Sequence, residues 1–151
     1  MAKFVYRMQS VLDIKYKLEE QAKQHYMAIQ TRLNSALDEL NTLCVRKKEY
    51  FRSYRELLAK QLNVLEIETC KNAILIMDEY IEEQRNKVNQ IEQELEQAAD
   101  AMTAAVKERK IYEKLKERQF EIFLQELNRE EMKEIDQLVS YQYNVRNTEE
   151  D

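Results

Sequence analysis

The chain has 151 residues, of which 35% are charged and 44% hydrophobic, and it contains neither glycine nor proline. Tight turns, β-bulges and phosphate-binding loops depend on those two residue types, so the composition excludes sheet-rich folds and predicts an almost entirely helical chain. The net charge of −5 argues against nucleic acid as a main partner.

A first helix is predicted over residues 4–60. Residues at a 3.5-residue spacing are mostly apolar here, which is the pattern of a coiled-coil seam. This seam row consists of Met8, Leu12, Lys15, Glu19, Ala22, Tyr26, Ile29, Leu33, Ala36, Leu40, Leu43, Lys47, Tyr50, Tyr54, Leu57 and Gln61. A second row runs beside it, made of Leu37, Cys44, Phe51 and Leu58. The apolar face is therefore wider than one partner helix needs, and we expect one row to close onto the chain and the other to meet a partner, with either assignment open.

A turn is predicted over residues 60–66. The heptad period weakens there, and Asn63 followed by Glu66 fits a capping box for a helix that begins at Val64. The alternative is one uninterrupted helix on the order of 130 residues, which would have to dimerise.

A second helix is predicted over residues 64–145, followed by a polar tail, 146–151, that we expect to be disordered. Its seam row consists of Ile67, Cys70, Ile74, Met77, Ile81, Gln84, Val88, Ile91, Leu95, Ala98, Met102 and Ala105. After Ala105 the period is expected to slip through Arg109 and Lys116 and to return, shifted, at Phe120.

The two helices are expected to pair as a hairpin. With the turn near residue 63, residue i of the first helix faces roughly residue 127 − i of the second, so that Leu33 faces Leu95 and Leu43 lies near Gln84. Residues 1–60 carry 12 basic and 7 acidic side chains and residues 61–151 carry 12 and 22, so the halves attract. The fold predicted is an all-α, long antiparallel two-helix coiled coil, one domain over residues 1–151, with a C-terminal helical overhang beyond Phe123.

Residues capable of catalysis or metal binding are sparse. His25 is the one histidine, and it lies on a helix surface. Cys44 and Cys70 form no CxxC motif, and the register places them on the order of 20 Å apart, so neither a disulfide nor a metal site is expected. We expect no enzyme activity, no cofactor and no small-molecule substrate.

The location expected is the cytoplasm. No run of about 18 apolar residues could span a membrane, and charges interrupt the N-terminal segment, which argues against a cleavable signal peptide. The basic and aromatic run over residues 46–55, RKKEYFRSYR, is typical of anionic partners but is explained more simply by ion pairs with the acidic second helix.

Three motifs resemble those of the flagellar FliJ family. They are FVYRMQSVLDIK at residues 4–15, EKLKERQ at residues 113–119 and EMKEID at residues 131–136, where Met132 replaces the usual glutamine. The order, spacing and chain length agree with that family, whose members are non-enzymatic, stalk-like coiled coils of the flagellar type III export apparatus.

The resemblance implies partners and sites. The paired termini would enter the export ATPase ring and promote its assembly, the region near the turn would contact the membrane export-gate protein, and the chain would escort export chaperones, peripheral to the inner face of the cell membrane. By alignment the gate contact falls on Glu39, Leu43, Arg46, Tyr50, Ala73, Met77, Tyr80 and Gln84. Arg46 and Ala73 depart from the aromatic residues often found there. Contacts with the ATPase ring fall on Phe4, Arg7, Met8, Leu12, Leu115, Arg118, Phe120 and Phe123.

Two other functions fit the same pattern. One is the equivalent stalk of a virulence-type secretion system. The other is a structural coiled-coil adaptor, which would form a stable dimer and leave an export ATPase unaffected.

Overall fold

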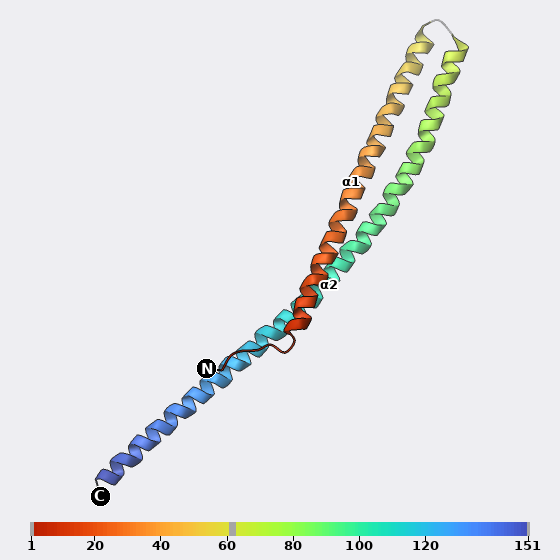
Figure 1. The fold of residues 1–151 in the computed structure, drawn as a ribbon. Helices are drawn as coiled ribbons and strands as arrows, with labels where there is room; N and C mark the ends of the chain where they lie inside the picture. Colours follow the sequence, from red (N-terminus) through yellow and green to blue (C-terminus); the bar gives the residue numbers. More distant parts are fainter. Residues whose placement is uncertain (1, 61–62, 151) are drawn as a thin grey trace. The chain divides into compact units, whose positions relative to one another are not determined.

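A computed structural model describes residues 2–60 and 63–150 and contains two helices, α1 (Gln9–Ala59) and α2 (Val64–Glu149) (Figure 1). No β-strand occurs within these residues. The helices pack against each other and run in opposite directions, which confirms the predicted all-α hairpin. The alternative of one uninterrupted helix is wrong, because α1 ends at Ala59 and the two helices share a seam.

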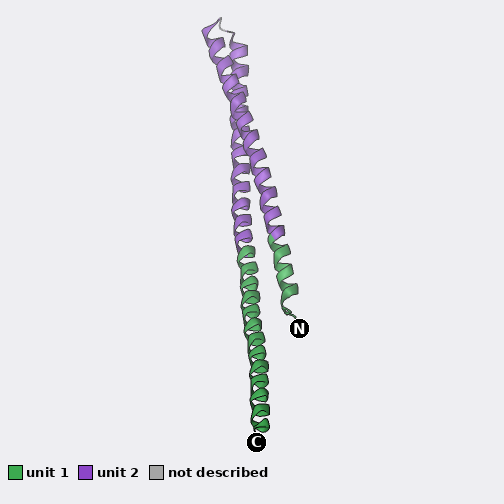
Figure 2. Cartoon of the chain, turned by 90° about the vertical axis from the view of Figure 1, so that its left-hand side faces the viewer, with its two compact units in different colours: residues 1–19, 105–151 green, residues 20–104 purple. Residues whose placement is uncertain are grey.

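The chain divides into two compact units (Figure 2). The turn unit comprises residues 20–104, and the terminal unit comprises residues 1–19 and 105–151. Each unit contains a segment of α1 and a segment of α2. That the whole chain acts as one domain stays a prediction.

The core of the turn unit is built from the predicted seam. Leu33 and Ala36 of α1 and Val88 of α2 are buried together, and the half-buried residues packed around them are Leu40, Ile91 and Leu95. Every predicted seam residue of α2 from Ile67 to Ala105 is buried or half-buried. A 3.5-residue repeat keeps these side chains on one stripe of the helix, so the stripe stays against its partner.

Ion pairs fix the register of the turn unit. Arg32 contacts Glu94 at 2.8 Å, and Lys47 contacts Asp78 at 2.5 Å. Each partner lies within two positions of the predicted one, so these two ion pairs agree with the hairpin arithmetic. Both pairs are exposed to solvent, so each contributes only about 0–1 kcal/mol and acts mainly on the choice of register.

The start of α2 agrees with the predicted cap. The carbonyl of Asn63 accepts a hydrogen bond of 3.1 Å from the Ile67 amide, which is the first turn of the helix. Residues 61 and 62 of the predicted turn, including the predicted seam residue Gln61, lie outside the described residues.

The N-terminal segment differs from the prediction. Residues 2–6 are not helical, and α1 begins at Gln9 rather than near residue 4. Tyr6 is buried and its hydroxyl donates a 3.1 Å hydrogen bond to the carbonyl of Tyr112. This tertiary anchor holds the segment against α2 and replaces the first turns of helix, for which the sequence offers no N-cap residue.

The C-terminal end of the chain also differs. The helix α2 continues to Glu149, so residues 146–149 are helical and not a disordered tail. Every residue from 128 to 150 is exposed. This is the predicted overhang, since no segment of α1 covers it within the terminal unit.

Replacing Leu33 by alanine should lower the free energy of unfolding by about 2 kcal/mol, the low end for a buried leucine, because a two-helix seam is thin. The matched control is Leu37→Ala in the exposed second row, which should cost less than about 0.5 kcal/mol. Urea titration followed by circular dichroism measures both. Equal losses would show that the second row is also buried.

Candidate functional site

The two apolar rows near the turn have different exposure. In the seam row from Ala36 to Leu57, every apolar residue except the exposed Tyr50 is buried or half-buried. In the second row Leu37, Phe51 and Leu58 are exposed, and Cys44 is half-buried. The seam row is therefore the more buried of the two. Which row meets a partner stays a prediction.

The eight residues predicted to contact the export gate all lie in the turn unit. They form one stripe on each helix, because four residues of each helix recur at spacings of three and four. Exposed members are Glu39, Arg46, Tyr50 and Tyr80, and half-buried members are Leu43, Ala73 and Met77. Tyr80 is 49% exposed, so it is the most accessible large aromatic residue of this set.

Gln84 stands apart from the other members of that stripe. It is only 6% exposed, and its amide donates hydrogen bonds to the carbonyl of Ala36 at 3.0 Å and to the carboxylate of Glu39 at 3.2 Å. A buried amide needs such partners, so Gln84 joins the two helices rather than facing solvent. It also lies opposite Ala36, one to two turns before the predicted neighbour Leu43.

A groove of about 900 Å³ runs along a different face of the turn unit. The second-row residues Cys44 and Phe51 line it, together with Ile81 of α2. Its remaining lining is polar and mostly basic, namely Lys47, Lys48, Arg52, Arg55, Asp78, Glu82, Arg85, Asn86 and Asn89. Of the basic run predicted to form ion pairs with the second helix, Lys47 does so with Asp78, whereas Arg52 pairs with Glu56 of its own helix.

Aromatic residues gather in the terminal unit. The ring of Phe4 lies 5.2 Å from the ring of Phe120 and 5.5 Å from that of Phe123, measured between centroids. These distances are typical of favourable aromatic pairs. The structure thus brings together three of the residues predicted to contact the ATPase ring.

The other residues predicted to contact the ATPase ring differ in their exposure to solvent. Leu12 is 2% exposed and belongs to the seam, so its side chain is not available to a partner. Arg7, Met8, Leu115 and Arg118 are exposed. The accessible part of this predicted surface is therefore made of these four residues and the exposed Phe120.

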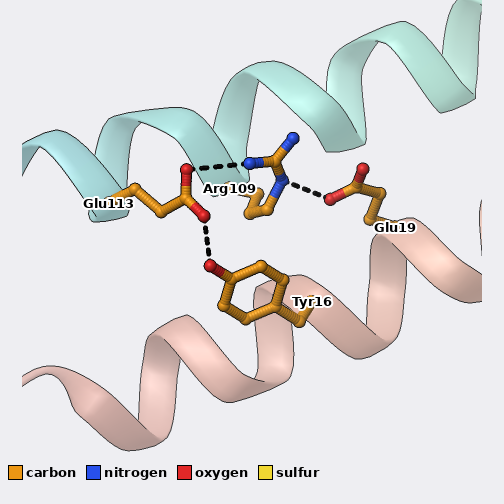
Figure 3. A network of polar contacts seen from close by, with 4 residues as sticks. All are labelled: Tyr16, Glu19, Arg109 and Glu113. Atoms are coloured by element: carbon orange, nitrogen blue, oxygen red, sulfur yellow. Dashed lines mark hydrogen bonds and ion pairs between the residues drawn. The ribbon is translucent and has the colours of Figure 1, made fainter.

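A polar network crosses the seam of the terminal unit (Figure 3). Arg109 of α2 donates one hydrogen bond to Glu19 of α1 and another, of 2.8 Å, to Glu113 of α2. Tyr16 of α1 donates its hydroxyl proton to Glu113. The guanidinium of Arg109 also lies 5.8 Å from the centre of the Tyr16 ring, within the range of a cation–π contact.

These contacts shift the acid–base properties of the network. The hydrogen bond from Tyr16, followed by that from Arg109, lowers the pKa of Glu113. The same Tyr16–Glu113 bond raises the pKa of Tyr16, because the bond requires the phenol proton. The bond to Glu19 raises the pKa of Arg109. At neutral pH, Glu113 is therefore a carboxylate and Arg109 a cation, while Tyr16 keeps its phenol proton.

The predicted slip of register after Ala105 is wrong. Arg109, Tyr112 and Lys116 are half-buried and continue the spacing of three and four, and Phe123 lies further along the same row. Polar side chains occupy seam positions here, because long stems of Arg and Lys can pack while their charged ends find partners. The polar seam positions Lys15 and Glu19 of α1 already signalled this, since the hairpin register places them opposite residues 108–112.

Neither a metal site nor a membrane span is seen. Within residues 2–60 and 63–150, no group of three His, Cys, Asp or Glu side chains could hold a metal ion. Cys44 and Cys70 are free and half-buried. Neither α1 nor α2, over the part of the chain that the structure describes, has a stretch long and apolar enough to cross a membrane.

The fold defines a coiled-coil hairpin with exposed aromatic and apolar side chains. The family model described as flagellar FliJ protein matches residues 4–148. The chain belongs to the flagellar FliJ family, and so to the structural components of the flagellar type III export apparatus.

Two other comparisons complete this picture. No curated protein matches the sequence. Among solved structures, the chain is similar to a protein described as a YscO homologue, CT670 from Chlamydia trachomatis, with 22% sequence identity over 97% of this chain and 99% of that one and a TM-score of 0.49.

Replacing Glu113 by glutamine should lower stability at pH 7 by up to about 1 kcal/mol, since solvent screens the network. Because the pKa of Glu113 is lowered on folding, its contribution is present above the ordinary value of 4.5 and is lost as pH falls through the folded value. The difference between wild type and variant should therefore shrink as the pH is lowered below 4.5. Thermal unfolding over a series of pH values from 7 downward measures it, with Glu130→Gln on the overhang as control. A difference that stays constant as the pH falls through the acid range would contradict the assignment.

Proposed function

We propose that the chain is a stalk of the flagellar type III export apparatus, which promotes assembly and activity of the export ATPase ring and couples the ring to the membrane export gate. The family match over residues 4–148 carries this proposal. It includes escort of export chaperones, and a place in the cytoplasm, peripheral to the cell membrane through these partners.

The terminal unit supplies the surface for the ATPase ring in this proposal. The cluster of Phe4, Phe120 and Phe123 combines an ordered N-terminal segment with α2, and Phe120 remains 43% exposed. The exposed Arg7 and Arg118 belong to the same unit. A partly exposed aromatic group with nearby arginines is the composition most enriched in strong protein contacts.

The turn unit supplies the surface for the export gate. We assign the contact to the exposed members of the predicted stripes, Glu39 and Arg46 with Tyr50 and Tyr80. Leu43, Ala73 and Met77 support them from the half-buried edge of the seam. Gln84 holds the two helices at this position and acts on the contact only through their spacing.

The purified chain should raise the turnover of the organism's export ATPase at a low molar ratio to the hexamer, because one stalk serves one ring. Phe4→Ala with Phe120→Ala should reduce the stimulation by at least about tenfold, the cost of losing an aromatic anchor. A coupled phosphate-release assay measures it. The control is Tyr141→Ala with Tyr143→Ala, two exposed aromatic residues outside the cluster.

The same assay separates the alternatives. A structural adaptor would form a stable dimer and leave ATPase turnover unchanged, which would overturn the proposal. A stalk of a virulence-type system would stimulate the ATPase of that system in preference to the flagellar one.

Tyr50→Ala with Tyr80→Ala should abolish binding to the cytoplasmic part of the export gate and leave helicity unchanged, because both side chains are exposed. Biolayer interferometry measures the binding and circular dichroism the fold. Tyr141→Ala with Tyr143→Ala again serves as the control and should bind normally. Loss of helicity would instead assign the two tyrosines to the core, and unchanged binding would remove this stripe from the gate contact.

A further inference from the structure

We propose that the groove of the turn unit binds the acidic end of α2, residues 128–145, from a second copy of the chain. The parts of α1 and α2 that line the groove would then pack with that segment as a local three-helix bundle.

The first observation is the second apolar row of α1. Leu37, Cys44, Phe51 and Leu58 recur every seven residues, and Phe51 is 42% exposed. A row with this spacing lies along one line of a helix. Another helix can pack along such a line, as in a coiled coil. In the turn unit the contact with α2 uses the adjacent row, so the hairpin leaves this second seam without a partner helix.

The second observation is the charge around that seam. Five basic and two acidic side chains line the groove. Lys48 of α1 and Arg85 of α2 form no ion pair or hydrogen bond with any residue that the structure describes, and Arg55 is placed over the Phe51 ring at 4.9 Å. An apolar floor with basic rims fits an acidic amphipathic helix.

The third observation identifies that helix. Residues 128–145 are helical, and all of them are exposed. Glu130 and Glu134 form an acidic row one turn apart, and Ile135 and Leu138 form an apolar row beside it. The segment contains four acidic and two basic residues, so its charge is opposite to that of the groove.

A second copy is the source that these observations favour. The segment has an exposed apolar row and an acidic row, the groove has an exposed apolar row and basic rims, and every copy carries both. Docking would cover both unpartnered faces at once, and charge complementarity would set the register. The second apolar row of α1 has four members, from Leu37 to Leu58. It is therefore long enough to accept a helix of the length of residues 128–145.

This inference goes beyond the proposed function and uses another face. The gate contact lies on Tyr50, whereas the groove is lined by Phe51, and neighbouring residues of a helix point about 100° apart. Self-association and gate binding can therefore be lost separately.

Sedimentation velocity of the full chain over increasing concentration tests the proposal. The chain should self-associate, and more weakly as salt rises, because the contact is charged. Lys48→Glu with Arg85→Glu should weaken association by about tenfold or more, and so should Glu130→Lys with Glu134→Lys. Mixing these two variants should restore association, since each supplies the surface that the other has lost or reversed.

Two further sets of variants complete the experiment. Lys17→Glu with Lys87→Glu changes the net charge as much as the groove variant, on exposed sites of both helices outside the groove and outside the predicted gate contact, and should associate like wild type. Phe51→Ala and Ile135→Ala leave all charges in place and should each weaken association, with circular dichroism confirming that the helices persist.

The outcomes are distinct. Self-association that is weakened in each variant alone and is restored when the two variants are mixed supports docking between copies. A chain that stays monomeric at all concentrations, association unaffected by either reversal, or equal loss in the control variant overturns the proposal. A groove reversal that abolishes binding of an acidic partner protein but leaves self-association unchanged also overturns it. None of these results depends on ATPase stimulation or gate binding.

Discussion

The narrowness of the contact between α1 and α2 governs everything else in this molecule. Two helices that meet along one stripe can shield only that stripe from water, and among the described residues only eight apolar side chains are buried. Large apolar residues such as Val64, Leu65 and Tyr80 remain exposed. A compact domain would bury such residues in a shared core, whereas here they stay available to partners.

Polar residues within the stripe make the pairing specific. An apolar heptad repeat alone would tolerate a slide of one heptad, because apolar residues would still meet apolar residues. After such a slide, Gln84 would lose the carboxylate of Glu39, and Arg109 would lose Glu19. Burying a polar group without its partner is costly, so these contacts select one register even where they add little to stability.

Most of the fold follows from the sequence, because heptad spacing and the absence of glycine and proline leave few alternatives. The register also follows, since a turn near Asn63 fixes which residues meet. Three features do not follow. The N-terminal segment is held by Tyr6 and Phe4, which act through residues more than one hundred positions away. Arg109 and Lys116 appear in the sequence to interrupt the heptad repeat, because the spacing rules count only apolar residues. The helical state of residues 146–149 has no local signal, since the tail is polar.

The candidate site was predictable to a lesser degree. The resemblance to the family predicts which stretch meets the gate, but spacing alone does not distinguish the row of Leu43 from that of Cys44. The structure separates the two rows by exposure, because Leu37, Phe51 and Leu58 of the second row are exposed and most of the first row is not.

This separation has a consequence for how such a protein works. At this level of α1, Tyr50 of the seam row and its neighbour Phe51 of the second row are both exposed, and they point about 100° apart around the helix. Only Phe51 lines the groove with its basic surroundings. If the export gate binds Tyr50 and a second copy binds Phe51, the two contacts would use different side chains at the same point of the hairpin. A wider bundle would bury one of these side chains, so the two-helix form is what would permit both contacts.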